Sequence, residues 1–233
     1  MKRHESINES KQLRARWRNL VVTLLLLGPA FSCGPALETR EETDQAGYRT
    51  EYQVSPETGE REGFARRYDP AGNLISEEAY TAGKLEGKRT AYYPDGSVEL
   101  VENYRGGLFH GEYITYDSLG NLRSLGQYTD GVMSDIWLRY WPNGRLREEV
   151  TVADNTENGP FREWYENGEP RAAGTYENGK EEGPLWQFDE SGQLIAYRNC
   201  EAGVCLAAWK AEEGGEAPAA PPDMTRPPDL DKK

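Results

Sequence analysis

A 24-residue period is the feature that most constrains this chain. Six units fill residues 62–205 without a gap or an insertion. One glycine recurs at the same phase in every unit: Gly72, Gly96, Gly120, Gly144, Gly168 and Gly192. Because the chain has 25 glycines in 233 residues, six of six at one phase is not a chance alignment. A tandem array is therefore predicted, in place of one deep globular core.

Further columns define the unit. An aromatic residue stands four positions before each of these glycines: Tyr68, Tyr92, Tyr116, Tyr140, Trp164 and Phe188. A second, mostly tyrosine column follows: Tyr80, Tyr104, Tyr128, Val152, Tyr176 and Cys200. Asn155 is the one substitute in the column of Gly83, and because Asn tolerates a left-handed backbone, this column predicts a positive φ. The unit from Asp135 to Glu157 departs most from the pattern, so we expect a local kink or a weaker turn there.

Each unit predicts two short strands and two tight turns. The stretch 93–96 places Pro second and Gly fourth, which is typical of a type I turn followed by a left-handed glycine. We expect the second turn, Tyr-x-x-Gly, to follow the same logic, so that successive strands are antiparallel. The predicted fold class is all-β: an elongated single-layer antiparallel sheet of tandem 24-residue β-hairpin repeats, stabilised by stacked aromatic columns.

The repeat pattern resembles the MORN-repeat variant of bacterial proteins often labelled YwqK-type antitoxins. The resemblance covers residues 62–205 and rests on the phased glycines and tyrosines. It implies a twisted sheet of consecutive hairpins that acts as a scaffold or a protein-binding surface. It specifies the fold far better than the function.

The first 33 residues have the parts of an export signal. A basic stretch ends at Arg18, an apolar run covers 20–27, and a small-residue region reaches Cys33. The apolar run is too short for a permanent membrane span. The end of this segment resembles the lipobox of bacterial lipoproteins, which implies lipidation of Cys33 and, with Gly34 next, transfer to an outer membrane. Ala30 and Phe31 depart from that pattern, so ordinary signal-peptidase cleavage stays open.

The predicted domain organisation follows from these segments. A signal peptide covers 1–32, and the lipidated Cys33 with a flexible acidic linker covers 33–47. An N-terminal half-repeat cap covers 48–61, the repeats cover 62–205, and a C-terminal cap strand covers 206–211. An acidic, Pro/Ala-rich tail, 212–233, is predicted to be disordered, with a docking peptide as its functional alternative.

Charge and cysteines narrow the partners. The formal net charge is −13, and the segment after the basic leader is more acidic still, which argues against binding nucleic acid. Cys200 and Cys205 flank the turn of the last unit in a chain predicted to be exported, so we expect a disulfide. A four-residue loop would place the two cysteines opposite each other, whereas a three-residue loop with a bulge would offset them.

The sequence favours a non-enzymatic protein. It holds two histidines, His4 in the leader and His110, and no Cys/His cluster or G-x-S-x-G elbow, so no catalytic residue, metal or cofactor is expected. The acidic residues are interpreted as a solvated face. A carboxylate-based wall hydrolase is the least favoured alternative.

Our leading hypothesis is a membrane-anchored envelope lipoprotein that presents a rigid repeat surface to another protein or an envelope polymer. An antitoxin or immunity protein that neutralises a toxin is the alternative that the family label implies. Five aromatic residues that break the repeat pattern are candidate partner contacts, unless they pack within the sheet: Tyr93, Trp137, Trp141, Tyr165 and Trp186.

Overall fold

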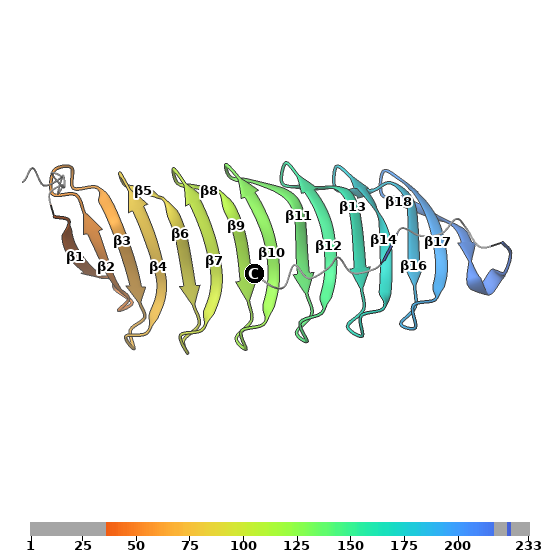
Figure 1. Cartoon of the computed structure of the whole chain (residues 1–233), viewed down its shortest axis with the longest axis horizontal. Coiled ribbons are helices and arrows are strands. Elements are labelled where there is room, and N and C mark those ends of the chain that lie inside the picture. The colour runs from red at the N-terminus through yellow and green to blue at the C-terminus, as the bar shows by residue number, and fades with distance from the viewer. Residues whose placement is uncertain (1–35, 217–222, 225–233) are drawn as a thin grey trace, which may run out of the picture. The chain divides into compact units, whose positions relative to one another are not determined.

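The chain folds into one open antiparallel sheet. The computed structural model describes residues 36–216, 223 and 224, so the predicted signal peptide and Cys33 lie outside the described residues. Eighteen strands form the sheet, and Figure 1 shows them side by side in chain order. The one helical element of the described segments is a short 3-10 turn, Ala211–Glu213. The all-β hairpin architecture is therefore confirmed.

The strand bounds follow the repeat. The first two strands are β1 (Glu38–Thr43) and β2 (Arg49–Val54). The first three units contain β3 (Arg61–Tyr68), β4 (Leu74–Thr81), β5 (Lys84–Leu85), β6 (Gly87–Tyr92), β7 (Val98–Arg105), β8 (Leu108–Phe109), β9 (Gly111–Tyr116) and β10 (Leu122–Thr129). The remaining strands are β11 (Val132–Tyr140), β12 (Leu146–Ala153), β13 (Thr156–Trp164), β14 (Pro170–Glu177), β15 (Lys180–Glu181), β16 (Gly183–Phe188), β17 (Leu194–Glu201) and β18 (Val204–Lys210).

Strand β1 corrects the prediction of a flexible spacer before residue 48. All six of its residues pair with β2, from Glu38 opposite Val54 to Thr43 opposite Arg49. The acidic composition does not prevent pairing, because β1 is an exposed edge strand whose Glu41 carboxylate lies 3.0 Å from the Arg49 guanidinium. Charged edge strands are also a common protection against further strand addition. The N-terminal cap is therefore a whole hairpin.

The first turn of each unit has the predicted conformation. Its glycine has a positive φ, for example +89° at Gly72 and +86° at Gly96. The glycine N–H donates to the carbonyl three residues earlier at 2.9 Å, as in Gly72 to Asp69. Where Asp begins the turn, its carboxylate also accepts hydrogen bonds from backbone N–H groups. The hydrogen bond from the Asn73 side chain is the main cause of the lowered pKa of Asp69, and the bonds from backbone N–H groups lower it further.

The second turn differs from the prediction. It is a two-residue turn in which both central residues have positive φ, such as +50° at Asp130 and +85° at Gly131. This is the type I′ geometry, whose twist matches that of the flanking strands. The sequence pattern concealed it because only the second position is nearly always glycine, whereas the first is Ala82, Gly106, Asp130, Asp154, Asn178 or Ala202.

The type I′ turns predict a stabilising substitution. Ala82 has a φ of +47°, which costs an L-residue roughly 1–2 kcal/mol. We therefore expect Ala82→Gly to raise the free energy of unfolding by about 0.5–1 kcal/mol, measured by denaturant unfolding. Ala79→Gly, in the middle of β4, is the matched control and is expected to lower it, because glycine weakens a strand. A loss of stability with Ala82→Gly would contradict this account.

The divergent unit keeps the backbone of the others. Asp135 has a φ of +64° and Asn155 a φ of +63°, so both substitutes adopt the left-handed conformation, as predicted for Asn155. One hydrogen bond of this turn is longer, because Asn155 N lies 3.5 Å from the Met133 carbonyl oxygen. The equivalent bond in the preceding unit, from Gly131 N to the Phe109 carbonyl oxygen, is 2.8 Å long. The Asn155 side chain compensates by accepting from Met133 N at 2.8 Å. The predicted weaker turn is therefore seen in this bond.

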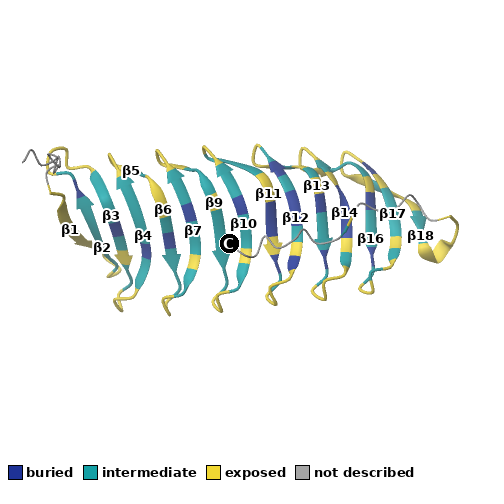
Figure 2. Ribbon diagram, in the orientation of Figure 1, coloured by how far each residue is buried: buried dark blue, intermediate teal, exposed yellow. Residues whose placement is uncertain are grey.

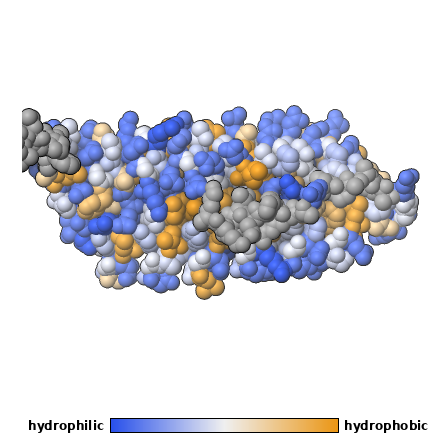
Figure 3. All heavy atoms as spheres, in the orientation of Figure 1, coloured by the Kyte–Doolittle hydropathy of each residue, from blue (hydrophilic) through white to orange (hydrophobic). Residues whose placement is uncertain are grey.

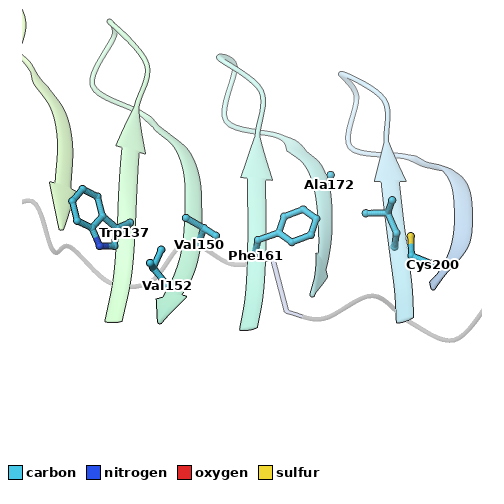
Figure 4. Packing of buried hydrophobic residues seen from close by; sticks show 7 residues of the cluster. Trp137, Val150, Val152, Phe161, Ala172 and Cys200 are labelled. Atoms are coloured by element: carbon cyan, nitrogen blue, oxygen red, sulfur yellow. The ribbon is translucent and has the colours of Figure 1, made fainter. Parts of the chain in front are cut away.

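The sheet has two faces, and each carries its own apolar cluster. Successive side chains in a strand alternate between faces, so Trp137 and Leu138 of β11 lie on opposite sides. The Trp137 face holds a cluster that includes Trp137, Val150 and Phe161, which Figure 4 shows in a row across β11 to β13. The Trp164 face holds Leu138, Tyr140, Leu146 and Trp164. Figure 2 shows that burial is most extensive around β11 and β12.

Candidate binding surface

The Trp164 face offers an apolar cluster on an open sheet. Leu138, Tyr140, Leu146 and Trp164 are each between 3% and 6% exposed, and the half-buried Leu122 and Leu125 extend the cluster toward β10. Figure 3 shows the sheet in the orientation of Figure 1, with hydrophobic residues scattered among hydrophilic ones. The four side chains are buried in this chain, with Met224 packed against them.

Two hydrogen-bond donors stand beside this cluster. Arg162 and Trp164 both come from β13, and alternation places them on the same face. The Arg162 guanidinium is held by the buried carboxylate of Glu149 at 3.0 Å. A second guanidinium nitrogen remains available for other acceptors. Buried apolar side chains and two hydrogen-bond donors therefore lie side by side on this face.

The C-terminal tail contacts these groups. Arg162 Nη1 donates to the Asp223 carbonyl at 3.0 Å, and Trp164 Nε1 donates to the Met224 carbonyl at 3.3 Å. The Met224 side chain packs against the apolar cluster. The prediction of a disordered tail is thus wrong at these two residues, because Met224 gains apolar contacts there. The rest of the tail beyond Glu216 lies outside the described residues.

Three of the five candidate contact residues line the edge formed by the first turns. Tyr93, Trp141 and Tyr165 each donate a hydrogen bond to a main-chain carbonyl 23 residues ahead, at 2.9–3.0 Å. They are half-buried and therefore connect one repeat to the next. Trp141 and Tyr165 also line an open hollow with Asn143 and Arg145. Their structural role is established by these bonds, and their role toward a partner stays a prediction.

The other two candidates lie on the strands. Trp137 is 6% exposed and packs at 5.6 Å from Tyr113 and 5.4 Å from Tyr128, so the prediction that it is an exposed contact residue is wrong. Its ring fills the space above Gly126, where a side chain would overlap it. Trp186 is half-buried and packs edge-on against Tyr197 at 5.7 Å. Only Trp186 lies on a strand with part of its ring accessible.

A buried charged network on the Trp137 face was missed by the sequence interpretation. Arg89 donates to Glu102 at 2.7 Å and to Glu78 at 3.1 Å, and the Glu102 side chain is 8% exposed. Tyr104 also donates to Glu102 at 3.1 Å. Burial and the Glu102 charge raise the pKa of the Tyr104 hydroxyl. The interpretation of the acidic residues as a solvated face is therefore wrong for Glu102 and for the buried Glu149.

The last hairpin holds the predicted disulfide. Cys200 and Cys205 are joined, with their Cα atoms 4.0 Å apart. They face each other directly in the β17–β18 ladder, and Ala202 and Gly203 form the two-residue turn between them. Of the two loop geometries considered, the one that places the cysteines opposite each other is confirmed. The bond fastens the terminal hairpin of the array.

Two general findings concern the chemistry of the surface. No group of three or more His, Cys, Asp or Glu side chains suited to a metal ion occurs in the described ranges. No helix within those ranges is long and apolar enough to cross a membrane.

Fold and surface together define a tandem-repeat β protein, in which each hairpin unit pairs with the next along one sheet. Three segments, residues 85–105, 109–130 and 157–178, match the family model of the MORN repeat variant. The unmatched stretch between the second and third segments contains Asp135, Val152 and Asn155, where the repeat pattern is broken. A comparison with curated proteins found no match.

Proposed function

We propose that this chain is a non-enzymatic lipoprotein of the bacterial envelope that presents its repeat sheet to another protein or to an envelope polymer. The single observation that carries the proposal is the apolar cluster around Trp164 on the open sheet, with donors beside it. A scaffold role is consistent with its array of MORN-variant repeats. Lipidation of Cys33 and placement on an outer membrane rest on the leader sequence.

The non-enzymatic role is supported by how the strand carboxylates are used. Glu77 accepts from Arg66 at 2.8 Å, and Glu149 is held by Arg162. Hydrogen bonds from Arg66 and Tyr92 lower the pKa of Glu77. A carboxyl whose pKa is lowered, as at Glu77, is poorly suited to act as a general acid, as a hydrolase pair would require. Glu163 differs, because burial raises its pKa. Turnover of wall glycans that Glu→Gln substitutions abolish would contradict this role.

The membrane anchor is tested by Cys33→Ser. Wild-type chain is expected to incorporate labelled fatty acid and to fractionate with membranes, whereas the Cys33→Ser chain incorporates none and is released, since the acyl chains provide the attachment. Cys205→Ser is the matched control, because it removes a cysteine of the terminal hairpin and is expected to leave labelling unchanged. Equal fatty-acid incorporation in both variants would contradict the proposal that Cys33 carries the lipid anchor.

The binding role is tested by crosslinked pull-down from intact envelopes. Capture of a defined protein or polymer that Leu146→Glu abolishes is expected, because a charge would then occupy the apolar cluster. An antitoxin role, which rests on family resemblance, predicts a different result: a neighbouring gene whose product kills only when this chain is deleted. Capture that Leu146→Glu leaves unchanged would refute the proposal that this apolar cluster is the binding surface.

A further inference from the structure

The Trp164 face has the properties of a peptide-binding groove. Its two donors, Arg162 and Trp164, are directed at consecutive main-chain carbonyls, those of Asp223 and Met224, at 3.0 and 3.3 Å. Side-chain donors that bind main-chain oxygens recognise an extended backbone without requiring N–H groups from it. A third element, the apolar cluster, receives the Met224 side chain. Two carbonyl contacts and one apolar pocket make a minimal peptide site.

The sequence of the tail matches this mode of recognition. Prolines flank the contact segment at Pro221, Pro222, Pro227 and Pro228. A proline has no N–H and cannot add to a strand ladder, but its segment still offers carbonyl acceptors. Grooves lined by aromatic residues with N–H donors are the usual receptors of Pro-rich peptides. Methionine between the prolines supplies a flexible apolar side chain that fits irregular pockets.

The combination of Arg and Trp at these two positions occurs in one of the six repeat units. The positions equivalent to Arg162 and Trp164 are Arg66 and Tyr68, Thr90 and Tyr92, Ile114 and Tyr116, Leu138 and Tyr140, and Trp186 and Phe188. Arg66 is the one other arginine at its position, and its Nε donates to Glu77 at 2.8 Å. The unit of β13 therefore differs from the rest of the array at the place where the tail is seated.

From these contacts we infer that the Trp164 face is a peptide-binding site whose ligand in the resting chain is its own C-terminal segment, bound through the Met224 side chain and the carbonyls of Asp223 and Met224. The tail is an intramolecular cover of the apolar cluster. Because a tethered ligand acts at an effective concentration on the order of millimolar, it competes with any free peptide of the same chemistry. This inference deepens the proposed binding function. The contact of the tail stands on the structure, whereas its role as a competitor of an external partner rests on the proposed function.

The test uses a labelled synthetic peptide of residues 219–230 and the full chain, with binding followed by fluorescence anisotropy. The Met224→Asp chain, whose own tail no longer fits an apolar pocket, is expected to bind the peptide. The wild-type chain is expected to bind it at least about ten-fold more weakly, because its tail occupies the site. A Leu230→Asp chain, with the same charge change six residues further on, is the matched control and should behave as wild type.

Further variants separate the site from folding. Trp164→Phe in the Met224→Asp chain keeps the ring but removes the N–H, and is expected to weaken peptide binding about five-fold. A peptide carrying Met224→Asp is expected not to bind. Equal affinity of the wild-type and Met224→Asp chains, or no binding by either, would overturn the inference, as would a concentration-dependent dimer of the wild-type chain that Met224→Asp abolishes. Failure here would show that the tail is not a ligand of the Trp164 face, and would leave capture of an envelope partner that depends on Leu146 as a separate result, so the two proposals are distinguishable.

Discussion

Trp137→Ala is expected to lower the free energy of unfolding by about 3–5 kcal/mol, the range for removing a large aromatic side chain from a packed core. Trp137 ends the aromatic series that begins at Tyr104 and Phe109, and Tyr113 and Tyr128 both lie within 6 Å of its ring centroid. An open sheet has no second layer to close the gap that the ring leaves, so relaxation is limited. Denaturant unfolding followed by circular dichroism measures the loss.

The matched control is Ile136→Ala in the same strand. Ile136 is 49% exposed, so its truncation is expected to change stability by less than about 1 kcal/mol. A second test uses Gly126, because a methyl group there would overlap the Trp137 ring. Gly126→Ala alone is expected to cost about 1–3 kcal/mol by overpacking, and most of that cost is expected to vanish in the Trp137→Ala background. Equal losses for Trp137→Ala and Ile136→Ala would contradict the assigned core.

The sequence was sufficient to predict the strand order because each repeat indicates where the backbone turns. Each phased glycine marks a backbone position with positive φ, and a turn at a fixed spacing leaves room only for short antiparallel strands. Asn155 was informative for the same reason. The type I′ class of the second turn was missed because its first residue, Ala82 or Asp130, does not favour the left-handed region strongly enough to be recognised.

The side-chain network was harder to predict because it depends on register between strands. Glu78 and Arg89 are separated by eleven residues, and Arg89 and Glu102 by thirteen. These separations add to one repeat, and Arg89 and Glu102 lie directly opposite each other in the β6–β7 ladder, so the strand register was the available signal. Without this register, the charged side chains were interpreted as exposed to solvent. The contact of the tail had no comparable signal, because Met224 lies outside the periodic region and its partners are about sixty residues away.

Arg89→Leu is expected to lower the free energy of unfolding at pH 7 by about 3–5 kcal/mol, since breaking a buried pair leaves its partner charge uncompensated. Two carboxylates, Glu78 and Glu102, would lose their counter-ion, and their side chains are only 21% and 8% exposed. In the variant, two partly buried carboxylates would lie close together without a counter-ion, which destabilises the folded chain.

Urea unfolding of the wild-type and Arg89→Leu chains at pH 7 measures this loss. Adding Glu102→Gln to Arg89→Leu is expected to recover part of the loss at pH 7, because the most buried charge is then removed. Arg105→Leu is the matched control: Arg105 and Asp130 are 2.6 Å apart but more than half exposed, so its loss is expected to stay below about 1 kcal/mol. A loss for Arg89→Leu as small as that of Arg105→Leu would mean that the network does not stabilise the N-terminal half of the sheet.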